Sequence, residues 1–176
     1  MPQFILKHPI PFEPDRTFMA PTLLFPDLPL LKLRATLKTS RPLPPFLYTG
    51  SAWRGIIGWE MQKLICPFDR SECSRCLIQE SCPYFRLFEQ QSSYSGLADS
   101  PRGYVLFSTL RDESRTRLEV TLVGSCAGFA AVVVQALIKA QKRGLGRDQT
   151  EFEIEELFEL RPDNDVLELG QSDGVM

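Results

Sequence analysis

Four of the five cysteines lie close together in residues 66–82, with the spacing C-x6-C-x2-C-x5-C. Cys73 and Cys76 could hold one metal ion between two thiolates, and the intervening loops are long enough to bring Cys66 and Cys82 to the same ion. Four thiolates around Zn²⁺ form a closed structural site with no open position for catalysis. An iron–sulfur cluster uses the same ligands, and a proline after the last cysteine is typical of one class of ferredoxin. The spacing therefore predicts a metal site and leaves zinc and iron–sulfur open.

The odd number of cysteines and the character of the N-terminus indicate a reducing compartment. Prolines and acids interrupt the first residues, MPQFILKHPIPFEPDRTF, so we expect no secretory signal. We also expect no membrane span, because we identify no apolar run of the ~18–20 residues that a span needs. A cytoplasmic protein with clustered metal-binding cysteines is the resulting prediction. Cys126 stands apart between apolar stretches and is interpreted as a small core residue.

A second group of candidate residues surrounds two glycines in residues 142–147, KRGLGR. Glycine lets a backbone approach a phosphate, and flanking cations attract one. A helix C-cap followed by a turn explains the same residues, because Gly144 suits the cap and a helix dipole favours cations there. Elsewhere, Tyr48 could stack on a base or pack on the sheet, and solvation is the simpler explanation of Arg54 and Lys63. The candidate phosphate- or base-contacting residues are Tyr48, Arg54, Lys63, Lys142, Arg143, Gly144, Gly146 and Arg147.

The net charge of −2 conceals an uneven distribution. Residues 1–150 carry 19 Lys and Arg against 13 Asp and Glu, whereas residues 151–176 carry one Arg against nine acidic residues. A mildly basic body permits a polyanionic partner, although a solvated surface and a charged tail explain the same charges. The composition, with 43% hydrophobic and 24% charged residues, argues against a wholly disordered or fibrous chain.

Hydrophobic periodicity predicts four strands and two helices. Residues 30–40 alternate between apolar side chains and a basic outer face, which is typical of a half-buried strand. Thr49 or Ser51 can cap a helix that Pro67 ends. We expect the remaining elements to be a hairpin of strands over 103–110 and 116–124, a helix over 127–143 and a last strand over 151–160.

That order, β-α-β-β-α-β, predicts an α+β, ferredoxin-like fold. In it, a four-stranded antiparallel sheet carries two helices on one face, as in RNA-recognition (RRM-like) modules. The domain would span residues 30–162, with a Cys-rich metal-binding insertion at 65–90. A proline-rich N-terminal arm over 1–29 and an acidic tail or linker over 163–176 would flank it.

Three segments together carry a resemblance to a known family. Residues 50–55, GSAWRG, are similar to the G-S-x-x-R-G start of the first helix in the RAMP superfamily of CRISPR-associated proteins. Residues 66–89 resemble the cysteine-bearing segment of one branch of its precursor-RNA processing endoribonucleases. Residues 143–148, RGLGRD, resemble the glycine-containing turn that closes the first ferredoxin-like domain of that family. The resemblance spans about residues 30–160 and favours RNA binding at the glycine loop.

The resemblance implies an endoribonuclease that binds CRISPR repeat RNA or crRNA and cleaves it without a metal ion. In this reaction the 2′-hydroxyl attacks the adjacent phosphate, which requires a base, an acid and stabilising cations. The family has two tandem ferredoxin-like domains, so we expect this chain to be the N-terminal half. The single histidine, His8, lies in the arm, so we expect the catalytic groups on the other half.

Two other functions remain open at this point. One is a non-catalytic RAMP subunit that holds guide RNA beside other subunits of a CRISPR effector complex. The other is a metal-stabilised interaction domain without an RNA partner. Binding of RNA that weakens with salt would distinguish the first of these from the second.

Overall fold

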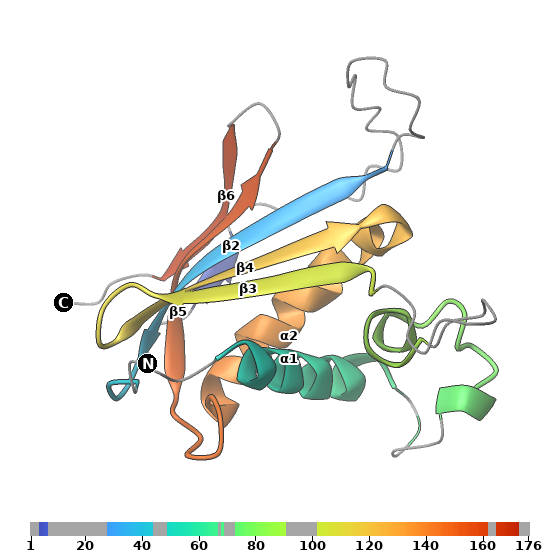
Figure 1. The fold of residues 1–176 in the computed structure, drawn as a ribbon, viewed down its shortest axis with the longest axis horizontal. Coiled ribbons are helices and arrows are strands. Elements are labelled where there is room, and N and C mark those ends of the chain that lie inside the picture. The colour runs from blue at the N-terminus through green and yellow to red at the C-terminus, as the bar shows by residue number, and fades with distance from the viewer. Residues whose placement is uncertain are drawn as a thin grey trace.

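The computed structural model describes residues 4–6, 28–43, 49–66, 68, 73–90, 102–161 and 165–172 (Figure 1). In these ranges the chain forms a single antiparallel sheet with two long helices against it. The elements are β1 (Phe4–Leu6), β2 (Leu30–Thr39), α1 (Gly50–Ile65), η1 (Cys73–Arg75), η2 (Phe85–Glu89), β3 (Tyr104–Leu110), β4 (Arg115–Val123), η3 (Gly124–Phe129), α2 (Ala130–Arg143), β5 (Phe152–Leu160) and β6 (Val166–Ser172).

The strand order in the sheet is β1-β6-β5-β2-β4-β3, and each neighbouring pair is antiparallel. The predicted α+β class with an antiparallel sheet is therefore confirmed. From β2 to β5 the elements also follow the expected order of strand, helix, two strands, helix, strand. In Figure 1, α1 and α2 lie on the same side of the sheet, and they pack against each other.

The sheet has six strands in the described residues, where four were predicted. β6 falls in the segment expected to be an acidic tail or linker, and it pairs with β5. The alternating pattern that indicates β6 in the sequence is short, with Leu167 and Leu169 on either side of Glu168. In the structure, Leu169 is fully buried. β1 falls in the arm expected to be irregular, and it pairs with β6. Neither strand could form without its partner, because a strand of three residues has no stability by itself.

The core fills the space between the helices and the sheet. Trp53, Ile56, Ile57 and Met61 are buried on α1, as their helical spacing predicted. The ring of Trp53 meets that of Phe152 on β5 edge to face, with centroids 4.9 Å apart. The apolar residues of β2, β4 and β5 that face the helices alternate with polar residues on the other face, as a half-buried sheet requires.

The first turn of α1 differs from the prediction in one detail. Thr49 occupies the N-cap position, but its side chain makes no capping hydrogen bond. Its hydroxyl instead lies 2.6 Å from the hydroxyl of Ser108 on β3. Thr49 is buried, so its polar group needs a partner, and the neighbouring strand supplies one.

The segment Gly124–Arg143, which combines η3 and α2, is long and apolar enough to cross a membrane by length and composition. The expectation that no such run exists was therefore wrong. In the structure, Val133, Val134 and Leu137 of α2 pack against residues of β2, β4, β5 and α1. This packing accounts for the apolar character of the helix.

We predict that β6 contributes to the stability of the domain. Leu169→Ala should lower the free energy of unfolding by ~2–5 kcal/mol, because the substitution removes a fully buried side chain. Val166→Ala, on the half-exposed opposite side of the same strand, should change it by less than about 0.5 kcal/mol. Urea denaturation of both variants measures the difference, and equal effects would show that β6 is not part of the cooperative core.

Candidate functional site

The face of the sheet away from the helices carries a row of side chains across four strands. In the pairing register, Phe107 lies opposite Glu119, Glu119 opposite Arg34, and Arg34 opposite Phe158. The next row contains Val105, which like Phe107 is more than half exposed, at 59% and 55%. Exposed apolar side chains that lie next to one another indicate a binding surface more often than single scattered ones do.

Cations lie on the same face of the sheet, on β2 and β4. Lys32 and Arg34 both bind Glu119, with N–O distances of 2.6 and 2.9 Å. Burial alone would raise the pKa of Glu119, but the hydrogen bonds and charges of Lys32 and Arg34 outweigh it and lower that pKa. One ionised carboxylate therefore balances only one of the two cations, and this part of the face keeps a positive charge.

Arg117 adds a further cation to the same face. It lies opposite Thr36 on one side and Thr109 on the other. Its Nε is buried and has no hydrogen-bond partner among the described residues. The charge of this guanidinium adds to the positive potential of the face.

The two halves of this sheet face differ in charge. The β2–β4 half carries five cationic side chains and one acidic one, which are Lys32, Arg34, Lys38, Arg115, Arg117 and Glu119. Toward β5 and β6, Glu153, Glu156 and Glu168 project from the strands, and Arg115 is paired with Glu155 at 2.8 Å. A polyanion would therefore be attracted to the half that contains Phe107, not to the β6 edge.

The structure brings together two of the residues that were selected as candidates from the sequence. The Nζ of Lys63 lies 5.5 Å, and the guanidinium of Arg143 4.4 Å, from the ring centroid of Trp59. Arg143 also lies 3.8 Å from the carboxylate of Glu60. This cluster joins the C-terminal halves of α1 and α2, so part of its role is to hold the helices together.

Arg54 lies in a different place from that cluster. Its Nε donates a hydrogen bond to the hydroxyl of Tyr104 at 2.9 Å, and Tyr104 in turn contacts the ring of Phe88. On a helix, positions 54 and 63 lie on opposite sides, so the two cations cannot contact the same phosphate. Tyr48 lies outside the described residues.

The glycine loop is a tight turn after α2. Gly144 has φ of +81° and ψ of 157°, a region that only glycine adopts readily, and a Cβ there would lie 2.2 Å from the carbonyl oxygen of Gln149. The amide of Leu145 donates to the carbonyl of Thr150, and that of Thr150 donates back. The C-cap explanation therefore accounts for Gly144. Lys142, Gly146 and Arg147 remain exposed at the turn.

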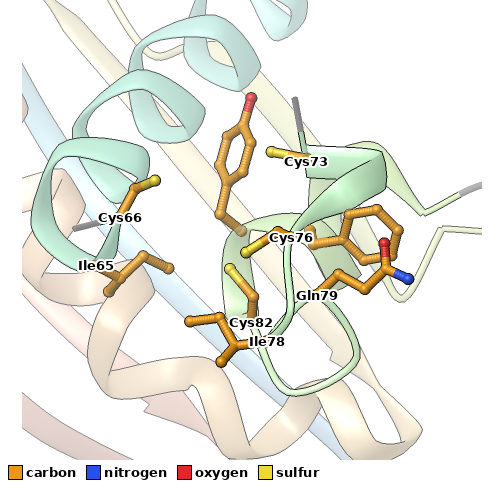
Figure 2. A pocket seen from close by; sticks show the side chains of 9 residues that line it. Ile65, Cys66, Cys73, Cys76, Ile78, Gln79 and Cys82 are labelled. Atoms are coloured by element: carbon orange, nitrogen blue, oxygen red, sulfur yellow. The ribbon is translucent and has the colours of Figure 1, made fainter. Parts of the chain in front are cut away.

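The four clustered cysteines line one pocket. Figure 2 shows the sulfur atoms of Cys66, Cys73, Cys76 and Cys82 directed toward a common hollow. All are thiols, and the hollow has a volume of about 20 Å³, room for a single water-sized group. No set of three or more His, Cys, Asp or Glu side chains in the described part of the chain is already arranged to hold a metal ion.

Burial and charge act on the thiol of Cys73 in this group. Burial, then the carboxylate of Glu89 and then the neighbouring cysteines raise the pKa of the Cys73 thiol. The hydroxyl of Tyr84, which also lines the pocket, donates a 2.8 Å hydrogen bond to Glu89. Cys126 is buried in the core away from this group, as expected, and burial raises its pKa as well.

The sequence did not identify the apolar and cationic side chains of the open sheet face as a site. Phe107, Phe158 and Arg117 were each part of a strand pattern, and only the basic outer face of residues 30–40 gave a signal. The pairing register is what places them in neighbouring rows.

We predict that the backbone conformation at position 144 requires glycine. Gly144→Ala should destabilise the protein by ~1–3 kcal/mol, because the new Cβ would collide with the backbone of Gln149. Gly146→Ala is the matched control: it also has positive φ, at +71°, but its Cβ would meet open space. Chemical denaturation should show the larger loss for Gly144→Ala; the reverse order would contradict this account of the loop.

Comparison with known proteins shows the family of this chain. Residues 28–174 match the AF_1859_N family, which is described as an N-terminal domain. No curated protein matches the chain. Because the match covers β2 through β6, and with them most of the chain, this protein belongs to the AF_1859_N family.

Proposed function

We propose that this domain binds single-stranded RNA on the open face of its sheet, as the N-terminal domain of a CRISPR precursor-RNA processing endoribonuclease of the RAMP superfamily. The observation that carries RNA binding is the exposed ring of Phe107 on the same sheet face as Arg117 of the neighbouring strand β4 and as Lys32 and Arg34 of β2. The assignment to the endoribonucleases rests on the sequence resemblance, and the description of the family as an N-terminal domain is compatible with it.

The arrangement of the elements supports a ferredoxin-like module. The strands β5-β2-β4-β3 lie in that order, and the two helices that connect them lie on one side (Figure 1). RNA-recognition modules with this arrangement stack bases on aromatic side chains of the open sheet. On this proposal, β1 and β6 extend the module at the β5 edge.

The surface offers the two kinds of contact that single-stranded RNA needs. Phe107 provides a ring on which a base can stack, and the cations of β2 and β4 provide charge for the phosphates. Phe158 lies three strands away in the same row, roughly 14 Å at the usual strand spacing. That separation leaves room for a strand of RNA to cross the sheet over Arg34.

The glycine turn and the Trp59 cluster form a second cationic area, at the ends of the helices. Lys142, Arg143 and Arg147 could contact the RNA backbone where it leaves the sheet or enters a second domain. Phosphate contacts of this kind position RNA without selecting its sequence.

Cleavage needs groups that we assign to a second domain. In the proposed reaction, a base takes the proton of the 2′-hydroxyl as its oxygen bonds to phosphorus. An acid then protonates the 5′-oxygen as its bond to phosphorus breaks. The role of the present domain is to hold and orient the repeat RNA for this step.

We expect Phe107→Ala to weaken binding of the intact chain to single-stranded repeat RNA about 5- to 150-fold, since one stacked base contributes ~1–3 kcal/mol. Val166→Ala, on the same face but beside the acidic side chains of β5 and β6, should leave the affinity unchanged. Fluorescence anisotropy at several salt concentrations measures both, and binding should weaken steeply with salt. RNA binding that neither variant alters would contradict the sheet-face site.

Incubation with labelled repeat RNA in EDTA tests the enzymatic half of the proposal. Cleavage at one position that leaves a 2′,3′-cyclic phosphate is the expected result for the protein containing both domains. Binding without cleavage by that protein would instead favour the non-catalytic guide-RNA subunit. If the protein neither binds nor cleaves the RNA, the alternative of an interaction domain without an RNA partner is favoured.

A further inference from the structure

We propose that Cys66, Cys73, Cys76 and Cys82 bind one Zn²⁺ ion in a four-thiolate structural site. This inference is independent of RNA binding. It rests on the convergence of four thiols, from the end of α1 and from the turns that follow, on a single hollow.

Local hydrogen bonds set the positions of these four residues. Cys66 follows the last turn of α1, and its amide donates to the carbonyl of Gln62. The amide of Cys76 donates to the carbonyl of Cys73 across η1, and successive turns continue to Cys82. The thiols therefore come from a helix end and from a short series of hydrogen-bonded turns.

The hollow suits one ion. Its volume of about 20 Å³ corresponds to one water-sized group, and Ile65, Ile78 and Phe85 add apolar side chains to its lining. A zinc–sulfur bond is ~2.3 Å long, so the cysteine-bearing turns must close further around the ion than they do here. A bond to zinc would replace the 3.1 Å hydrogen bond that the thiol of Cys66 donates to the carbonyl of Phe68.

The four cysteine ligands define the charge and proton balance of zinc binding. Each of the four thiols loses its S–H bond and forms a Zn–S bond, and the four protons pass to the buffer. The product is a zinc tetrathiolate with a net charge of −2, and no electron is transferred. Binding should therefore tighten as the pH rises.

The site would stabilise the connection between α1 and β3. In the described part of this connection, Leu87 is buried, Phe88 packs on Gly58 of α1, and Arg86 donates a 2.7 Å hydrogen bond to Ser125. These contacts fasten its second half to the domain. A metal ion would fasten Cys66 and the turns around Cys73 and Cys76 to the same unit.

Metal analysis of the intact chain, purified under reducing conditions without chelator, tests the proposal. We expect one zinc per chain by mass spectrometry. Replacement of zinc by Co²⁺ should give the sulfur-to-cobalt charge-transfer absorption of tetrahedral thiolate coordination. A folded protein that binds neither ion would overturn the proposal, as would iron with inorganic sulfide and the broad visible absorption of a cluster.

A pair of cysteine variants locates the ion. Cys76→Ala should lower zinc affinity at least about tenfold, whereas Cys126→Ala, in the core, should retain one zinc. Chelator should lower the melting temperature of the wild type but not that of Cys76→Ala. Full zinc retention by Cys76→Ala would overturn the site. If Cys76→Ala does not fold, the cobalt spectrum of the wild type decides.

Discussion

The pairing of β2 with β4 and β5 gives the sheet two faces with different environments. One face is covered by α1 and α2 and contains the core. The other has no helix among the described residues and carries the side chains of the opposite parity. Because side chains alternate along a strand, the requirement that Leu33, Ala35 and Leu37 be buried also fixes Lys32, Arg34 and Thr36 on the open face. The proposed RNA surface thus follows from the way the core is built.

The residues that sequence reasoning selected as candidates for RNA contact serve different purposes in the structure. Gly144 satisfies a backbone requirement at the end of α2, and Arg143 joins the helices through Trp59 and Glu60. Arg54 is directed to Tyr104, on the side of the cysteine pocket. Charge and residue type cannot separate a cation that packs on an aromatic ring from one that faces solvent, because both occur on the polar side of a helix.

The sheet face and the cysteine pocket lie at different places in the fold and rest on different physics. On the sheet, cations outnumber the acid that neutralises them, and an exposed ring lies beside them. In the pocket, four thiols line a common hollow. The first arrangement can attract an anionic polymer at a distance, whereas the second is the site we propose for a single metal ion. The metal site, if filled, would therefore support the domain without taking part in RNA contact.

The sequence by itself determined the local elements. Apolar periodicity located both helices and the strands β2 to β5 within a few residues, because burial of one face dictates the pattern. It also singled out the four cysteines by their spacing. Tertiary structure alone decided the addition of β1 and β6, whose short patterns are stable only when paired. It alone also placed Phe107 in one row with Glu119 and Arg34, since strand register brings together residues far apart in the chain and no local pattern encodes such an arrangement.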